Sequence, residues 1–335
     1  MNIHERLEGS GIVVESPLMR EVAGQIERAA VSAAGVLVAG EPGTGRGLVA
    51  RAIHACGHED GAPFVTIDAS AIFPADAERL TFGVPGHGSR ERGRRAGSPE
   101  VVYPGSLLHG ALGGTVFFRH VEELPVRVQA RLATLFRDRE FLESPDGEPV
   151  PFTARPVAAV DRDEQSYIDE GRVRLDLHRR FAELSITIPP LRERREDIPA
   201  LARAFISRSC RRRQVAAREL DSAAEAVLSA MPWHANAHEL SELLEGLVES
   251  APGDGPITLR ELLDHVSLDG GNHALPATGV PLREARARFE REYIAAVVAR
   301  HHGRIPAAAK TLGIQRTNLY RKLRAMRIEA PRQSV

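Results

Sequence analysis

The chain has little cysteine, almost no lysine and no long apolar run. Its 335 residues include only two cysteines, Cys56 and Cys210, which is typical of a protein from a reducing cytoplasm and gives no metal-site spacing. The absence of a run of about 18 apolar residues argues against a membrane-spanning helix. The first residues, MNIHERLEGSG, lack the apolar segment of a secretory signal. We therefore expect a cytoplasmic protein with no membrane partner.

Positive charge is concentrated in one stretch near the C-terminus, although the formal net charge of the chain is −1. Between Arg304 and Arg327 there are seven basic residues and no acidic one, and the only two lysines, Lys310 and Lys322, fall inside it. A local basic block in a nearly neutral chain favours a polyanion as the partner of that block. The alternative is an ordinary solvated helix face.

Short apolar segments alternate with helical patterns in the first half of the chain. The expected strands are 34–40, 63–69, 114–119, 155–160 and 183–188, and the clearest helices are 45–56 and 122–137. Apolar strands separated by helices are typical of a parallel sheet covered on both faces. The sequence therefore predicts an α/β fold up to about residue 195.

The rest of the chain is predicted to be helical. Residues 196–252 have an all-helical pattern and are expected to form a small subdomain. Glycine and proline cluster from 253 to 281, which favours a linker that includes a short helix at 258–266. A final domain, 282–335, is expected to contain a long amphipathic helix at 282–301 and two shorter helices at 305–312 and 316–326.

A glycine-rich loop lies between the first predicted strand and the helix after it. It reads Gly40-Glu41-Pro42-Gly43-Thr44-Gly45-Arg46-Gly47, close to the phosphate-binding pattern GxxxxGK[ST], in which backbone N–H groups point at an anion. The pattern fails at its last two positions, because Arg46 replaces lysine and Gly47 replaces serine or threonine. Arginine keeps the charge but is larger and planar. The candidate nucleotide-binding residues are Gly40, Glu41, Gly43, Thr44, Gly45, Arg46 and Gly47, and they leave binding of ATP or ADP open.

The segment 303–327 has the pattern of a helix-turn-helix. Its apolar residues are spaced to pack two short helices, and Gly313 falls where the turn between them needs a positive φ. Polar and cationic residues open the second helix, where side chains can reach bases and phosphates of double-stranded DNA. The candidate DNA-binding residues are Arg316, Thr317, Asn318, Tyr320, Arg321 and Lys322. The alternative is a three-helix bundle with a basic face.

Several segments in order resemble the NtrC-type, sigma-54-dependent activators, which are AAA+ proteins ending in a Fis-type helix-turn-helix. The similarity covers roughly residues 10–328. It is carried by VAGEPGTGRGLVARAIH (Walker A), GGTVFFRHVEELPVRVQARLATLFRDREF (Walker B), GRVRLDLHRRF (arginine fingers), IPPLRERREDIPAL, and MPWHANAHELSELLE (second sensor). The resemblance implies an AAA+ P-loop sheet with a helical lid, followed by an all-α Fis-type domain.

The chain departs from this family where the family performs ATP hydrolysis. The Walker B pair of Asp and Glu, which holds Mg²⁺ and polarises the attacking water, is Arg119 and His120 here. The first sensor position is Asp161 and the second is His238, whereas Arg174 and Arg180 both align with the arginine fingers. The resemblance therefore implies neither a Mg²⁺ site nor catalytic residues, unless Glu122 or Glu123 substitutes from beyond the strand end.

The segment 82–92 aligns with the GAFTGA loop that contacts the sigma factor, but no GAFTGA is present. The stretch 83–99 is instead rich in glycine and arginine. It is expected to be a solvated basic loop, with contact to nucleic acid as the alternative. No input domain is expected before residue 12.

Two main interpretations follow from the family. The first is a DNA-binding transcription regulator that does not hydrolyse ATP. The alternative is a functional ATP-dependent sigma-54 activator that remodels RNA polymerase, and a third is a partner that joins mixed rings with an intact relative. In the family the helix matching 282–301 helps to pair subunits. We therefore expect a homodimer that reads half-sites about one DNA turn apart, with a larger ring and contact with RNA polymerase as further expectations.

Overall fold

The computed structural model describes residues 9–58, 61–85, 99–161, 164–250 and 255–268. It also describes five single positions near the C-terminus, Ile305, Arg316, Leu319, Lys322 and Leu323. The chain divides into two compact units, 1–269 and 270–335, and each is described by itself. Within the described ranges, no helix is both long and apolar enough to cross a membrane.

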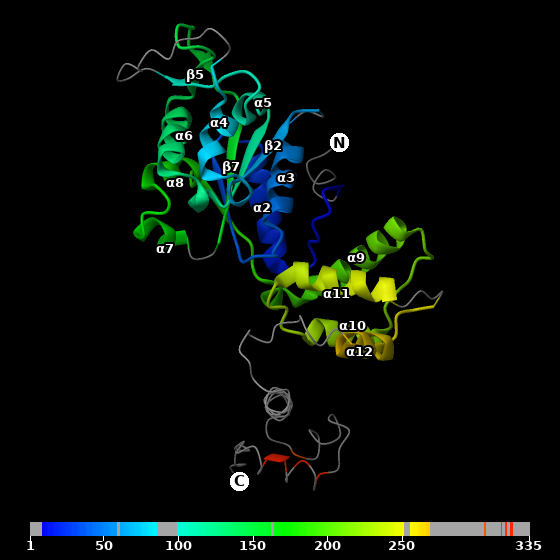
Figure 1. Cartoon of the computed structure of the whole chain (residues 1–335). Helices are drawn as coiled ribbons and strands as arrows, with labels where there is room; N and C mark the ends of the chain where they lie inside the picture. The colour runs from blue at the N-terminus through cyan, green and yellow to red at the C-terminus, as the bar shows by residue number, and fades with distance from the viewer. Residues whose placement is uncertain are drawn as a thin grey trace. The chain divides into compact units, whose positions relative to one another are not determined.

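A five-stranded parallel sheet forms the centre of the first unit (Figure 1). The strand order is β2-β4-β7-β1-β8, and every neighbouring pair is parallel. All five strands lie where the sequence predicts them, and the α/β fold class is confirmed. Their bounds are β1 Val36–Ala39, β2 Phe64–Asp68, β4 Thr115–Arg119, β7 Arg155–Val160 and β8 Leu184–Thr187.

Both faces of the sheet are covered, which explains why its three central strands, β4, β7 and β1, are apolar without alternation. In β1, Val36 and Val38 pack in one core with α2 (Pro17–Ala30) and α3 (Arg46–Gly57). Leu37 and Ala39 pack on the other side, where the core includes residues of α4 (Pro74–Phe82), α6 (Val126–Asp138) and α8 (Leu175–Phe181). The predicted helix 122–137 is split into a 3-10 turn, η2 (Val121–Glu123), and α6, because Pro125 forms the N-cap between them.

Three short strands form a small second sheet. Its strands are β3 (Glu100–Val101), β5 (Glu140–Leu142) and β6 (Val150–Pro151). Arg131 of α6 lies beneath it, where its guanidinium binds the carboxylates of Glu78 and Glu100, both at 2.8 Å, and stacks 3.8 Å from the ring centre of Phe82. These contacts fix both ends of the glycine- and arginine-rich stretch, of which residues 86–98 lie outside the described ranges.

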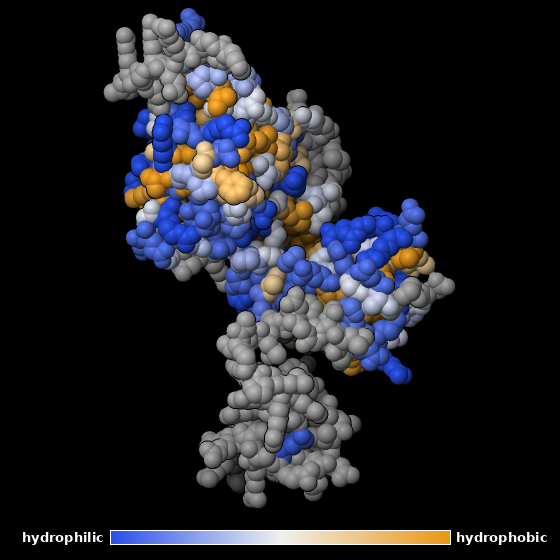
Figure 2. All heavy atoms as spheres, in the orientation of Figure 1, coloured by the Kyte–Doolittle hydropathy of each residue, from blue (hydrophilic) through white to orange (hydrophobic). Residues whose placement is uncertain are grey.

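Shorter elements complete the α/β part. They are η1 (Ala69–Ala71), α5 (Leu107–Gly110) and α7 (Glu164–Asp169). Figure 2 shows apolar residues scattered among polar ones on the viewed face. Large apolar side chains are exposed at Phe73, Val126 and Leu175.

The helical subdomain contains α9 (Ile198–Arg213), α10 (Ser222–Ala230), α11 (Asn236–Ser250) and α12 (Leu259–Leu268), after two 3-10 turns, η3 (Leu191–Glu193) and η4 (Arg195–Asp197). Its core surrounds the single tryptophan, Trp233, which is 1% exposed and donates its indole N–H to the Leu228 carbonyl at 2.8 Å. The short helix predicted at 258–266 is confirmed as α12, but the linker predicted from 253 does not begin there. Ile257 and Leu262 are 0% and 1% exposed in this same core, so residues 257–268 belong to the subdomain.

In the second unit, the five described positions are all helical. Ile305, Leu319 and Leu323 are buried, whereas Arg316 is exposed. Leu319 and Leu323 lie one helical turn apart, and Arg316 precedes them as the sequence pattern predicts. The predicted pairing helix 282–301 and the candidate DNA-binding residues Thr317, Asn318, Tyr320 and Arg321 lie outside the described residues.

Candidate functional site: a phosphate-loop cavity without Walker B acids

The glycine loop adopts the backbone that a phosphate-binding loop requires. Gly43 and Gly45 have φ values of +78° and +103°, which favour glycine, and Gly45 is the N-cap of α3. The Thr44 hydroxyl donates to the Glu41 carbonyl at 2.7 Å and closes the turn. The start of α3 therefore presents free N–H groups and the positive end of its dipole towards the space beside the loop.

Two arginines from the start of the lid bind the loop. The Arg192 guanidinium forms a paired contact with the Glu41 carboxylate, with N–O distances of 2.7 and 2.6 Å. Arg194 is only 4% exposed and donates to the Thr44 carbonyl at 2.9 Å. Burial lowers the pKa of Arg194, although the nearby Asp197 carboxylate opposes this effect. Glu41 thus serves to anchor the loop to the lid.

The start of α11 lies directly against the loop. Asn236 donates its side-chain amide to the Pro42 carbonyl at 2.9 Å. A Cβ placed on Gly43 would lie 2.0 Å from the Ala235 carbonyl oxygen and 3.0 Å from the Cβ of His238. Glycine is therefore required at 43 by both its φ and this contact. The His238 ring itself points to Glu242 of its own helix, with 3.4 Å between Nε2 and the carboxylate.

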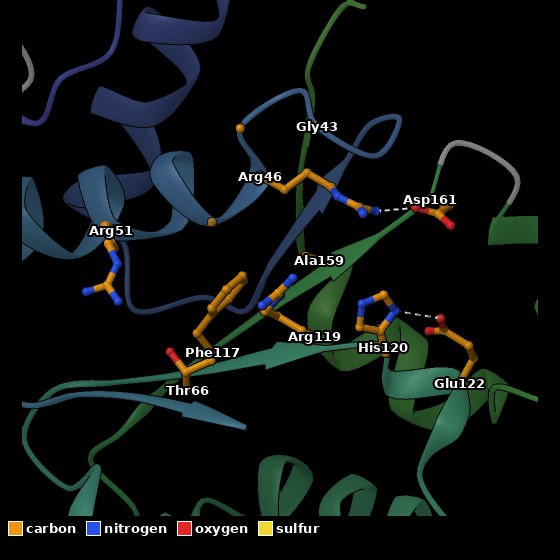
Figure 3. A pocket seen from close by; sticks show the side chains of 12 residues that line it. Gly43, Arg46, Arg51, Thr66, Phe117, Arg119, His120, Glu122, Ala159 and Asp161 are labelled. Atoms are coloured by element: carbon orange, nitrogen blue, oxygen red, sulfur yellow. Dashed lines mark hydrogen bonds and ion pairs between the residues drawn. The ribbon is translucent and has the colours of Figure 1, made fainter. Parts of the chain in front are cut away.

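A cavity of about 320 Å³ lies beside the loop, at the carboxyl ends of the central strands (Figure 3). Ligands of open parallel sheets bind at this edge. Loop residues, strand ends and α3 contribute its lining: Gly43, Gly45, Arg46, Gly47, Arg51, Thr66, Phe117, Arg119, His120, Glu122, Ala159 and Asp161. The structure thus brings together the loop, both altered Walker B positions and the first sensor position.

Arg46 is paired with Asp161 inside this cavity. The guanidinium forms a hydrogen-bonded ion pair with the carboxylate, as Figure 3 shows, and the two side chains are 16% and 32% exposed. Tyr167 donates its hydroxyl to the other Asp161 oxygen at 3.4 Å. Burial and the negative charges of Asp161 and Glu122 raise the pKa of Tyr167. The cation that would meet a phosphate is therefore already neutralised by a carboxylate of the same chain.

The two altered Walker B residues have their own acidic partners. Arg119 ends β4 and lies in register with Asp68, the last residue of β2, and its guanidinium is 3.0 Å from that carboxylate. His120 follows with a φ of +53°, and its Nδ1 lies 3.4 Å from the Glu122 carboxylate. A cation and an imidazole thus occupy the strand end.

The donor set around the cavity does not fit Mg²⁺, which needs several oxygen ligands in octahedral geometry. Gly47 has no side-chain hydroxyl, and Arg119 places positive charge at the strand end. Asp161 and Glu122 line the cavity, but each is 3.4 Å or closer to a cationic or imidazole partner. Across the described ranges, no three histidine, cysteine or acidic side chains form a group that could hold a metal ion.

The two finger-like arginines do not line the cavity. Arg174 is the N-cap of α8, and its guanidinium binds both oxygens of Asp176 at 3.0 and 2.7 Å. This hydrogen bond raises the pKa of Arg174 and lowers that of Asp176. The buried Gln129 accepts from the Arg174 backbone N–H at 2.9 Å and donates to the carbonyls of Leu124 and Arg172. Arg180 lies on the same helix, α8.

Some site residues have no signal in the sequence. Thr66 and Ala159 line the cavity but belong to no motif considered above. Arg51 and Phe117 also line it, and they lie within the Walker A and Walker B segments at positions to which no role was assigned. Asp68 could have been found, because parallel strands of equal length bring residues 68 and 119 to the same edge of the sheet.

Comparison with known proteins supports the family over most of the chain. Three family models match: Sigma-54 interaction domain over residues 12–187, AAA+ ATPase lid domain over 192–275, and Bacterial regulatory protein, Fis family, over 285–326. The lid match extends beyond α12, in agreement with the buried Leu262.

Similar curated proteins are transcription regulators. The nitrogen assimilation regulatory protein NtrX of Azorhizobium caulinodans is 34% identical over 94% of this chain and 68% of its own length. The regulatory protein AtoC of Escherichia coli is 31% identical over 98% and 71%, and NtrC of Klebsiella pneumoniae is 31% identical over 95% and 70%.

Among solved structures, NtrX from Brucella abortus in complex with ADP, and the same protein with ATP, match with a TM-score of 0.67 and 29% identity. Each match covers 95% of this chain and 70% of the other. The fold, the ordered domain matches and these relatives lead to one assignment: the chain belongs to the NtrC-type family of sigma-54-dependent transcriptional regulators.

Proposed function

We propose that this chain is a DNA-binding transcription regulator that does not hydrolyse ATP. The observation that carries the proposal is the end of β4, where Arg119 and His120 line the phosphate-loop cavity. Phosphoryl transfer depends on a metal that neutralises developing charge and on a group that positions the attacking water. A guanidinium repels the metal, and the His120 ring lies 3.4 Å from the Glu122 carboxylate.

Glu122 and Glu123 do not replace the missing acids. Glu122 lines the cavity but its carboxylate lies next to the His120 ring, and the Glu123 carboxylate binds Arg172 at 2.9 Å. Neither residue lies at the strand end, from which a Walker B acid reaches the metal. Nothing in this arrangement supplies the pair of free carboxylates that the ATP-driven alternative needs.

We assign DNA binding to the helix-turn-helix. Arg316 is exposed on a helix whose Leu319 and Leu323 are buried, which is the arrangement of a helix that packs by one face and presents the other. We assign contact with double-stranded DNA to Arg316, Thr317, Asn318, Tyr320, Arg321 and Lys322. Homo-oligomerisation through 282–301 and contact with RNA polymerase are part of the same proposal, and they rest on the family.

Nucleotide binding is the second part of the proposal. The Brucella abortus relative was crystallised with ADP and with ATP, and here the loop glycines keep a phosphate-binding backbone. We assign a nucleotide to the cavity as a ligand that is bound and not consumed. Such a ligand would stabilise the folded α/β and lid parts by mass action.

The DNA-binding assignment is tested with the full chain and genomic DNA fragments enriched by their binding to it. We expect Arg316→Ala and Arg321→Ala to weaken binding and to reduce the slope of log affinity against log salt by about one contact each. The matched control is Arg211→Ala, which removes the same charge from the exposed end of α9. Unchanged affinity and slope in both helix variants would contradict the placement of the recognition helix.

A further inference from the structure

Three arginines line the phosphate-loop cavity, and one of them, Arg119, stands at a Walker B position where the family has an acid. Arg46, Arg51 and Arg119 all line it, from the loop, α3 and the end of β4 respectively. In a metal-dependent site, Mg²⁺ would neutralise the phosphate oxygens. We propose that this cavity binds the phosphate chain of a nucleotide without a divalent cation, and that the Arg119 guanidinium takes over the charge of the metal. The inference rests on the loss of the metal site in the proposed function.

Arg119 has the position and freedom that this role requires. Its backbone is fixed by register with Asp68 on β2 and Ala159 on β7, so the side chain begins at the edge where the cavity opens. The side chain is 51% exposed, and Figure 3 shows it directed from the strand end towards the loop. Its ion pair with Asp68, at 3.0 Å, is solvent-accessible and therefore weak. A terminal phosphate carries up to two negative charges, and two of its tetrahedrally arranged oxygens can accept a pair of N–H groups from one guanidinium, so it competes well for Arg119.

The ion pair between Arg46 and Asp161 also affects how tightly the cavity binds a phosphate. The Asp161 carboxylate binds the Arg46 guanidinium, which is the group that would otherwise bind a phosphate oxygen. The carboxylate therefore both occupies Arg46 and repels an incoming anion. Phosphate binding must release this pair, so Asp161 sets the affinity of the empty site. An amide at this position keeps the shape and removes the competing charge.

These two residues give variants with opposite expected effects. Arg119→Gln removes the charge that replaces the metal, so phosphate binding should weaken. Asp161→Asn removes the competitor, so binding should tighten. Misfolding cannot explain tighter binding, so the pair keeps the test decisive even if one variant loses stability. Arg211→Gln is the matched control, because it removes the same charge from the exposed end of α9, outside the cavity.

The experiment measures the affinity of the full chain for fluorescently labelled ADP, in excess Mg²⁺ and in excess EDTA. We expect the two affinities to agree within about threefold, Arg119→Gln to lose about tenfold or more in EDTA, and Asp161→Asn to gain about tenfold. Competition with unlabelled ADP, pyrophosphate and inorganic phosphate distinguishes a nucleotide from a simple anion. ADP should compete best, because the cavity also has apolar walls at Phe117 and Ala159.

Three results would overturn the inference: binding that Mg²⁺ tightens tenfold or more, no binding in either buffer, or Arg119→Gln behaving like the Arg211→Gln control. Each is distinguishable from a failure of the proposed function, which is measured separately as phosphate release. A chain that binds ADP only with Mg²⁺ but releases no phosphate contradicts the arginine assignment alone. A chain that releases phosphate contradicts both.

Discussion

At the scale of single residues, the loop glycines are held by two different constraints. Gly43 has both a positive φ and a carbonyl 2.0 Å from the place of a Cβ, whereas the corresponding space at Gly45 is open, with 4.0 Å to the nearest atom. Gly45→Ala should therefore cost only the backbone strain, about 1–2 kcal/mol. Gly43→Ala should cost about 1–3 kcal/mol more, because the lid must move. Equal urea midpoints for the two variants would argue against the contact between lid and loop.

A partly buried histidine, His54, gives a pH dependence of stability. Burial, followed by the nearby His58, lowers the pKa of His54, which also shares a hydrogen bond of 2.9 Å with Thr115. The unfolded chain therefore takes up a proton on His54 near pH 6.5, before the folded chain does. The free energy of unfolding should fall as the pH drops through about 6.5 towards the lowered folded value.

His54→Gln keeps a hydrogen-bonding side chain beside Thr115 and removes the titration. The loss of unfolding free energy between about pH 7.5 and pH 5.5 should be smaller in this variant, by less than about 1 kcal/mol because the side chain is only partly buried. His234→Gln is the control, since His234 is exposed. An equal pH dependence in His54→Gln and the unchanged chain would show that His54 does not contribute.

At the scale of elements, Gln129 links α6 to the segment before α8. Its amide is 0% exposed and satisfies three backbone groups, on Leu124, Arg172 and Arg174. Gln129→Leu would leave these groups without partners, and we expect a loss of about 3 kcal/mol or more in unfolding free energy. Gln165→Leu on the exposed α7 should cost less than about 0.5 kcal/mol. A small loss for Gln129→Leu, seen by chemical denaturation, would mean that water replaces the amide.

The strands could be predicted from sequence more completely than the elements around them. A strand buried on both faces is a short apolar run, so Val36–Ala39 and Arg155–Val160 are visible without any alignment. Helix α12 was predicted as a short helix within a linker, but its place in the core of the subdomain was not, because Ile257 and Leu262 stand in a stretch rich in glycine and proline. Their burial depends on α10 and α11, which local sequence does not show.

The main residues of the candidate site could be predicted from the sequence, but the ion pair between Arg46 and Asp161 could not. Arg46, Arg119, His120 and Asp161 each stand at a motif position, so sequence alone identifies them. The ion pair between Arg46 and Asp161 joins residues 115 positions apart, and the sheet order, not the spacing, brings them together. Asp68, the partner of Arg119, lies at the same edge of the sheet. Glu122, the partner of His120, follows it two residues later in the chain.

At the scale of the whole molecule, the chain keeps the P-loop sheet and the lid of its family, while Arg119 and His120 stand at the Walker B positions. Arg192, Arg194 and Asn236 still hold the loop from the lid, so the α/β part and the lid remain tied together independently of catalysis. We infer that this body now serves assembly and ligand binding beside a DNA-reading domain. The guanidinium at the end of β4 suits an anion as its ligand, and on this ground we propose that the cavity holds no Mg²⁺.

The most direct test is phosphate release by the purified full chain with ATP and Mg²⁺, measured with the protein concentrated enough to assemble. We predict no release above background, and no change on Arg46→Ala or on addition of the enriched DNA fragments. Turnover of even about one per minute that Arg46→Ala abolishes would contradict this account, because it would require a working metal site in this cavity.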